Sequence, residues 1–119
     1  MTQICIVGRD WKFRALVRAE LREQGYEALG LETLDEVGKA IAGGQVSPAA
    51  IVFDLSETDN RDRDLATLRS LALSVPVILI ASHSNLPDSS ALPEGLAALF
   101  RPLTIAEVVS HVRARLGKP

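Results

Sequence analysis

A single carboxylate, Asp54, directly follows an unbroken apolar run, Ala49–Phe53. A run this apolar and rich in β-branched residues predicts a strand covered on both faces, as in a parallel sheet. In open parallel sheets, binding and chemistry take place just beyond the carboxyl ends of the strands. Asp54 is therefore the leading candidate for a functional residue. The alternative is that its side chain only accepts hydrogen bonds from the backbone of the following turn.

Other side chains that could do chemistry lack the neighbours that such chemistry needs. Ser56 and Ser82 have no adjacent base in the sequence for nucleophilic catalysis. His83 has no second histidine, cysteine or carboxylate at the spacing of metal ligands. We therefore expect no enzyme in its own right, and no cofactor held by these residues.

Composition limits the class of protein. The 119 residues are 47% hydrophobic and 24% charged, with a net charge of −2, as expected for one globular domain over residues 1–119. That charge gives no sign of nucleic-acid or membrane binding by this domain. Apolar runs such as Val75–Ala81 have only strand length. The lone Cys5 excludes an internal disulfide and favours a reducing, cytoplasmic location, with the thiol buried and inert.

Strand-like runs alternate with helical patterns, which predicts βαβ units around a single parallel sheet, an α/β doubly wound fold. The expected strands are Gln3–Val7, Tyr26–Leu29, Ala49–Phe53, Val75–Ala81 and Ala97–Phe100. The expected helices run from an N-cap at Asp10 to Gln24, from Thr33 to Gly43, over Arg61–Leu73, and from Thr104 to Leu116. Residues 83–95 contain two prolines, so we expect the fourth helix of the fold to be shortened or irregular there.

This layout resembles the receiver domain of two-component response regulators, the CheY-like fold, over nearly the whole chain. The most telling segments are Ile51–Asp54, Val75–Ser82 and Phe100–Leu103 just before a capped helix. The resemblance implies a five-stranded flavodoxin-like sheet with strand order 2-1-3-4-5. In that order the carboxyl ends of the strands would bring together Arg9, Asp54, Ser82 and Arg101.

The resemblance also implies roles for individual positions. Asp54 matches the phosphoacceptor aspartate of the family. The family's hydroxyl residue falls on Ala81, although Ser82 follows it, and the family's lysine before a proline falls on Arg101. The aromatic residue that acts as a switch on the fifth strand falls on Ala98. The chain therefore resembles a degenerate, atypical receiver.

The metal ligands of the family are the clearest departure. Its acidic pair after the first strand falls on Gly8 and Arg9, and Mg²⁺ needs carboxylate or phosphate oxygens. Asp10 is the nearby acid, and its expected role is the N-cap of the first helix. We expect no metal at this site, so Mg²⁺ binding is doubtful. We expect Arg9 to form an ion pair with Asp54 that blunts its nucleophilicity, whereas the alternative is a solvated surface arginine.

Three functions follow from these observations. The favoured one is a signal-transduction module that binds a partner protein, such as a histidine kinase, a phosphotransfer protein or a downstream effector, without Mg²⁺-dependent phosphorylation. The first alternative is a phosphorylatable receiver that accepts a phosphoryl group on Asp54. The second is a flavodoxin-like domain that binds a small ligand or anion at Arg9 and Arg101.

A basic stripe on the first predicted helix is the candidate partner surface. Its members, at spacings of three and four residues, are Trp11, Arg14, Arg18 and Arg22. We expect it to face solvent, opposite an apolar stripe made of Phe13, Leu16, Val17 and Leu21. Trp and Arg are enriched in binding hot spots, which favours an acidic partner surface. The alternative is a solvated, arginine-rich surface.

Overall fold

The computed structural model describes residues 2–84, 92 and 95–117 of the chain. Its sheet has five parallel strands in the order β2-β1-β3-β4-β5, which confirms the predicted fold class and strand order. The strands are β1 (Gln3–Val7), β2 (Glu27–Leu31), β3 (Ala50–Asp54), β4 (Val77–Ala81) and β5 (Leu96–Phe100). β3 and β4 are buried at every position, as expected for central strands of a parallel sheet.

Helices connect the strands and begin at the residues that the sequence favours. They are α1 (Trp11–Glu23), α2 (Leu34–Ala42), α3 (Arg61–Leu71) and α4 (Ile105–Leu116), with a short 3₁₀ helix, η1 (Leu55–Glu57), directly after β3. The Asp10 carboxylate accepts from the backbone N–H groups of Lys12 and Phe13, which confirms it as the N-cap of α1. Thr33 and Thr104 cap α2 and α4 in the same way.

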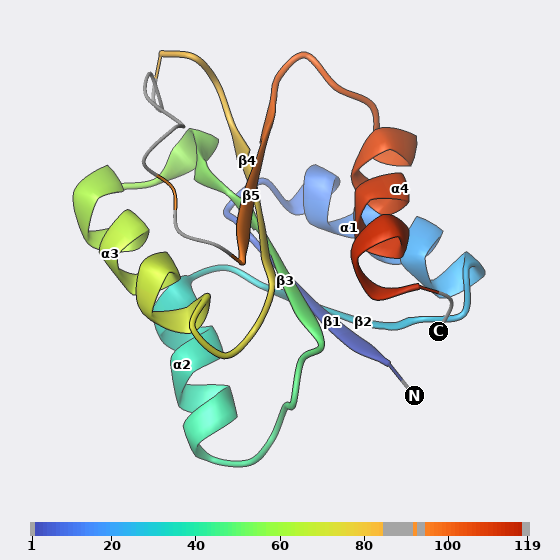
Figure 1. Ribbon diagram of the computed structural model, residues 1–119, viewed down its shortest axis with the longest axis horizontal. Helices are drawn as coiled ribbons and strands as arrows, with labels where there is room; N and C mark the ends of the chain where they lie inside the picture. Colours follow the sequence, from blue (N-terminus) through green and yellow to red (C-terminus); the bar gives the residue numbers. More distant parts are fainter. Residues whose placement is uncertain (1, 85–91, 93–94, 118–119) are drawn as a thin grey trace.

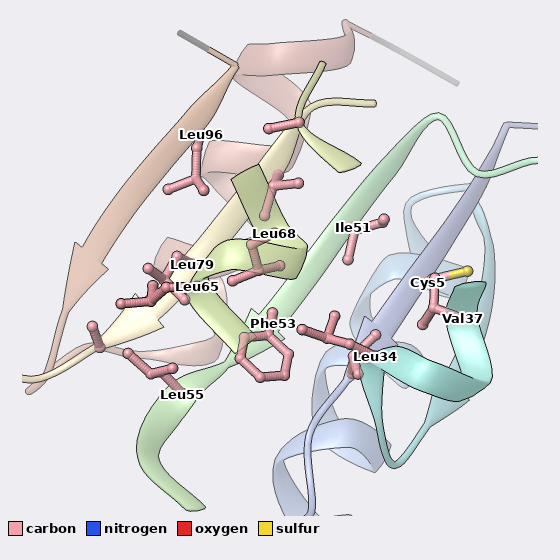
Figure 2. Close-up of a cluster of buried hydrophobic side chains, with 14 residues drawn as sticks. Cys5, Leu34, Val37, Ile51, Phe53, Leu55, Leu65, Leu68, Leu79 and Leu96 are labelled. Atoms are coloured by element: carbon pink, nitrogen blue, oxygen red, sulfur yellow. The ribbon is translucent and has the colours of Figure 1, made fainter. Parts of the chain in front are cut away.

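The helices cover both faces of the sheet, with α1 and α4 on one face and α2 and α3 on the other (Figure 1). Each face has its own cluster of buried side chains. Figure 2 shows the cluster beneath α2 and α3, where Phe53 of β3 lies among aliphatic side chains. The cluster beneath α1 and α4 includes Phe13, Val17 and Leu21. Cys5 is buried in the first cluster, which confirms the prediction of a buried thiol, and burial raises its pKa to about 11.

Some local predictions differ from the structure. Leu16 was expected in the buried stripe of α1 but is 57% exposed. The reason is that Phe13, Val17 and Leu21 form one i, i+4, i+8 ridge that fills the contact, and Leu16 lies about 100° around the helix from Val17. β2 begins one residue later than predicted, at Glu27. The predicted irregular helix near residues 83–95 lies mostly outside the described residues.

The register places the carboxyl ends of the central strands at one edge of the sheet. Val7 is opposite Phe53, and Asp54 is opposite Ile80. Ala81, the last residue of β4, is opposite Phe100, the last residue of β5. Residues that directly follow these strands therefore meet at this edge, where the candidate site lies.

Candidate functional site

Asp54 is the last residue of β3. With 4% exposure, it is the one buried charged residue in the described part of the chain. Gly8, which follows β1, lies against it. A Cβ atom at position 8 would stand 3.0 Å from the Cβ atom of Asp54, closer than side chains normally pack. The absence of a side chain at Gly8 therefore allows the end of β1 to pack directly against the aspartate.

Both carboxylate oxygens of Asp54 are engaged. Oδ1 accepts from the backbone N–H of Ser56 at 3.1 Å and from the Ser56 hydroxyl at 2.7 Å. Oδ2 accepts from Nη2 of Arg101 at 2.8 Å. The side chain of Asp54 thus caps η1, as the turn interpretation predicted, and also forms a charge-assisted ion pair.

Arg101 is the cation that reaches Asp54. It follows β5 directly, its peptide bond to Pro102 is cis, and its guanidinium carbon lies 5.4 Å from the centre of the Phe13 ring. That distance is within the range of a cation–π contact. Its Nε is buried and has no hydrogen-bond acceptor among the residues that the structure describes. Arg101 therefore joins β3, the β5–α4 connection and α1.

The predicted ion pair between Arg9 and Asp54 is wrong. Arg9 instead pairs with Asp59 of the β3–α3 connection, with Nη2 and Oδ2 2.5 Å apart. Two physical reasons account for this. The oxygens of Asp54 are already taken, and Arg9 and Asp59 are both well exposed, so their pairing requires little desolvation.

A small cavity of about 30 Å³ lies beside this pair and is large enough to hold water. Gly8, Arg9, Asp54 and Asp59 are among its lining residues. Asp64 also lines the cavity, and its carboxylate accepts from the Thr58 hydroxyl. Three of the acids that line the cavity, Asp54, Asp59 and Asp64, therefore already have partners.

The residues present do not fit the Mg²⁺ ion that the receiver fold implies. Gly8 offers no side-chain oxygen, and its carbonyl accepts from the guanidinium of Arg14. Arg9 places a positive charge in the same cavity, and both oxygens of Asp54 already accept hydrogen bonds. Within the described ranges, no group of three or more His, Cys, Asp or Glu side chains is arranged to hold a metal ion.

The structure changes the interpretation of Ser56. Ser56 does have a neighbouring base, because its hydroxyl is 2.7 Å from the Asp54 carboxylate. The signal that was missed is the Asp-x-Ser spacing, which is typical of a turn in which the aspartate accepts from the residue two positions on. Ser82 follows β4, and its hydroxyl lies 2.8 Å from that of Ser84.

Strand β5 carries no aromatic ring at position 98. Ala98 is half-buried and packs against the cluster beneath α2 and α3. An aromatic pair is present two residues further along β5, where the ring of His83 stacks on the ring of Phe100 with the ring centres 4.3 Å apart and an interplanar angle of 2°. This pair lies at the adjoining carboxyl ends of β4 and β5.

The basic stripe on α1 is only partly as predicted. Trp11 is 64% exposed, and Arg18 and Arg22 are exposed. Arg14 is not part of a free surface, because it is half-buried, lies over Gly30 of β2 and donates to the carbonyl of Gly8. Residues four positions apart on a helix are offset by about 40°, so Arg14 and Arg22 differ by about 80°, with Arg14 nearer the sheet edge and Arg18 and Arg22 facing outward. Leu16 is exposed on the same helix but lies about 120–160° around its axis from Trp11, Arg18 and Arg22, so it is not part of this surface.

No helix in the described part of the chain is long and apolar enough to cross a bilayer. No protein-family model matches the sequence, and no curated protein matches it.

Solved structures do match. The receiver domain of the nitrogen regulatory protein C has a TM-score of 0.77 at 27% identity, with 95% of this chain and 93% of that chain covered. A structure described as a transiently phosphorylated switch in bacterial signal transduction has a TM-score of 0.75 at 25% identity, with 95% and 92% covered. A response regulator receiver protein from Burkholderia phymatum has a TM-score of 0.77 at 22% identity, with 100% and 98% covered.

Proposed function

We propose that this domain, which has the fold of response-regulator receivers, is a signalling module that binds a partner protein without Mg²⁺-dependent phosphorylation of Asp54. The receiver fold supports a role in two-component signalling, and receivers are generally modules that work through partners. The partner is a histidine kinase, a phosphotransfer protein or a downstream effector. The proposal takes residues 1–119 as one domain with no catalytic activity of its own, acting in the cytoplasm.

The occupancy of the Asp54 carboxylate carries this proposal. A carboxylate that attacks a phosphoryl group needs a free oxygen and a means of stabilising the charge on the transferred group. Here one oxygen accepts from Ser56 and the other from Arg101, and the positions where acids would hold a metal are Gly8 and Arg9. The pair of Asp54 with Arg101 neutralises the aspartate in the resting protein.

The outer surface of α1 is the proposed partner site. Trp11, Arg18 and Arg22 are exposed along one side of this helix. Lys12 lies over the Trp11 ring at 5.9 Å and adds a further positive charge. Large aromatic and arginine side chains dominate binding hot spots, and the charges favour an acidic surface on the partner.

The other two functions receive less support. Binding of a free anion at Arg9 and Arg101 would require both guanidinium groups to leave the carboxylates of Asp59 and Asp54. A phosphorylatable receiver would require Asp54 to break its contact with Arg101 without a metal to replace it.

Partner binding tests the proposal. A partner captured by the immobilised domain is identified, purified and titrated against variants. Wild type should bind equally with and without Mg²⁺, Asp54→Asn should still bind, and the double variant Arg18→Glu and Arg22→Glu should not bind. The matched control reverses charge elsewhere, Arg61→Glu and Arg69→Glu on α3, and should bind normally. A partner that requires Mg²⁺ and an intact Asp54 would overturn the proposal, and normal binding by the α1 variant would exclude this surface.

A further inference from the structure

We infer that Arg101 couples the charge on Asp54 to the first turn of α1 through the ring of Phe13. The partner surface on α1 then responds to any event that neutralises or engages Asp54. The effect on partner binding rests on the proposed function. The coupling between Asp54 and α1 is a property of the domain alone.

The contacts of one guanidinium group carry the inference. Its Nη2 donates to the buried Oδ2 of Asp54 at 2.8 Å, and its carbon atom lies 5.4 Å from the centre of the Phe13 ring. Both contacts involve buried partners, since Asp54 is 4% and Phe13 6% exposed. A planar, rigid cation cannot shift at one of these contacts without shifting at the other.

The guanidinium is held in place by the charge of Asp54. Its Nε is buried and has no acceptor within the described residues, so that end of the group is not fixed by a hydrogen bond. A buried donor without a partner destabilises this placement. The other end of the side chain has a route to water, because 37% of the Arg101 side chain is exposed. Loss of the negative charge on Asp54 therefore releases Arg101 toward solvent.

Release of Arg101 would change the surroundings of the first turn of α1 before those of the rest of the helix. Phe13 is in the first turn of this helix, its backbone N–H donates to the capping carboxylate of Asp10, and Trp11 lies two residues before it. The surface proposed to bind the partner therefore begins next to the ring that Arg101 contacts. By contrast, β5 has Ala98 at the position where the receiver resemblance implies a switch aromatic, so no ring at that position can respond to Asp54. The chain of contacts from Asp54 thus runs through Arg101 and Phe13 to α1.

Nuclear magnetic resonance of the isolated domain tests the coupling without any partner or phosphodonor. The Nη2–H group of Arg101, which donates to Asp54, should give a slowly exchanging signal that the face of the Phe13 ring shifts upfield. In Asp54→Asn, exchange at this group should be faster by between about ten- and a hundredfold, the range that loss of a charge-assisted hydrogen bond implies. The amides of residues 11–14 should shift in the same variant.

Two control variants separate coupling from local disturbance. Phe13→Leu keeps an apolar side chain but removes the ring, so the upfield shift should disappear and Asp54→Asn should no longer move residues 11–14. Asp59→Asn neutralises the neighbouring carboxylate, which pairs with Arg9, and should leave Arg101 and α1 unchanged. The inference is overturned if Asp54→Asn shifts only the β3–α3 connection, or if it moves α1 equally without the ring. If Phe13→Leu does not fold, the comparison of wild type with Asp54→Asn decides by itself. Neither outcome depends on whether Asp54 is phosphorylated.

Discussion

The ion pair between Arg101 and Asp54 should be the strongest charge interaction at the site, and a double-mutant cycle measures it. At 2.8 Å, two unit charges attract by about 6 kcal/mol at an effective dielectric constant of about 20. Desolvation of the buried carboxylate and the partial exposure of Arg101 reduce this value. We expect a coupling free energy of about 1–3 kcal/mol.

The two single variants should differ in their cost. Arg101→Met leaves a buried carboxylate with only the donors of Ser56, so we expect the free energy of unfolding to fall by about 3 kcal/mol. Asp54→Asn leaves an arginine whose side chain can rotate toward solvent, so we expect the free energy of unfolding to change by no more than about 1 kcal/mol. Adding Asp54→Asn to Arg101→Met should recover part of the lost stability, because it removes the unpaired charge.

Urea unfolding of the four proteins, with matched m-values, gives the cycle. The control is the cycle for Arg9 and Asp59, an exposed pair that should couple by no more than about 1 kcal/mol. Additive effects of Arg101→Met and Asp54→Asn, within about 0.3–0.5 kcal/mol, would refute the pairing. A larger coupling between Arg9 and Asp54 would show that the wrong cation has been assigned to the site.

Further variants test the fold and the metal site. Stability should fall as pH rises from the ordinary thiol pKa of 9.0 to about 11, because the unfolded chain loses the Cys5 proton first, and Cys5→Ala should lack this part of the slope. Among exposed glycines, Gly38→Ala should stabilise by about 0.5–1 kcal/mol because nothing lies within 4 Å of the added Cβ. Gly95→Ala, at φ +93° with the new Cβ 2.8 Å from the Ala72 carbonyl oxygen, should destabilise by about 2 kcal/mol or more in the same urea measurement. Titration with Mg²⁺ should leave Trp11 fluorescence unchanged, and saturable quenching that Asp54→Asn abolishes would contradict this.

The fold could be predicted from the sequence because its signals are local and mutually consistent. The apolar runs of β3 and β4 have strand length, and Asp10, Thr33 and Thr104 cap helices where their types predict. The boundaries that moved, as at β2, depend on sheet pairing that extends Glu27–Leu31 alongside β1. Leu16 was misplaced because periodicity alone does not show how wide the contact of α1 with the sheet is.

The sequence predicts which residues lie at the site but not how they pair. The sequence, with the receiver resemblance, places Arg9, Asp54 and Arg101 at one edge, but it cannot tell which arginine pairs with Asp54. That choice depends on reach and desolvation in three dimensions: Arg101 lies against Phe13 and Asp54, whereas Arg9 finds the exposed Asp59. The role of Arg14 was missed for the same reason, since its acceptor is a backbone carbonyl at Gly8.

The most direct test of the central claim is covalent modification of Asp54. The domain is incubated with acetyl phosphate and Mg²⁺, and its intact mass is recorded beside that of an authentic phosphorylatable receiver and of the Asp54→Asn variant. Because both oxygens of Asp54 are engaged and Gly8 and Arg9 supply no metal ligand, we predict that the wild-type mass stays unchanged while the authentic receiver gains one phosphoryl group. A Mg²⁺-dependent gain of one phosphoryl group that hydroxylamine removes, and that Asp54→Asn lacks, would contradict the claim.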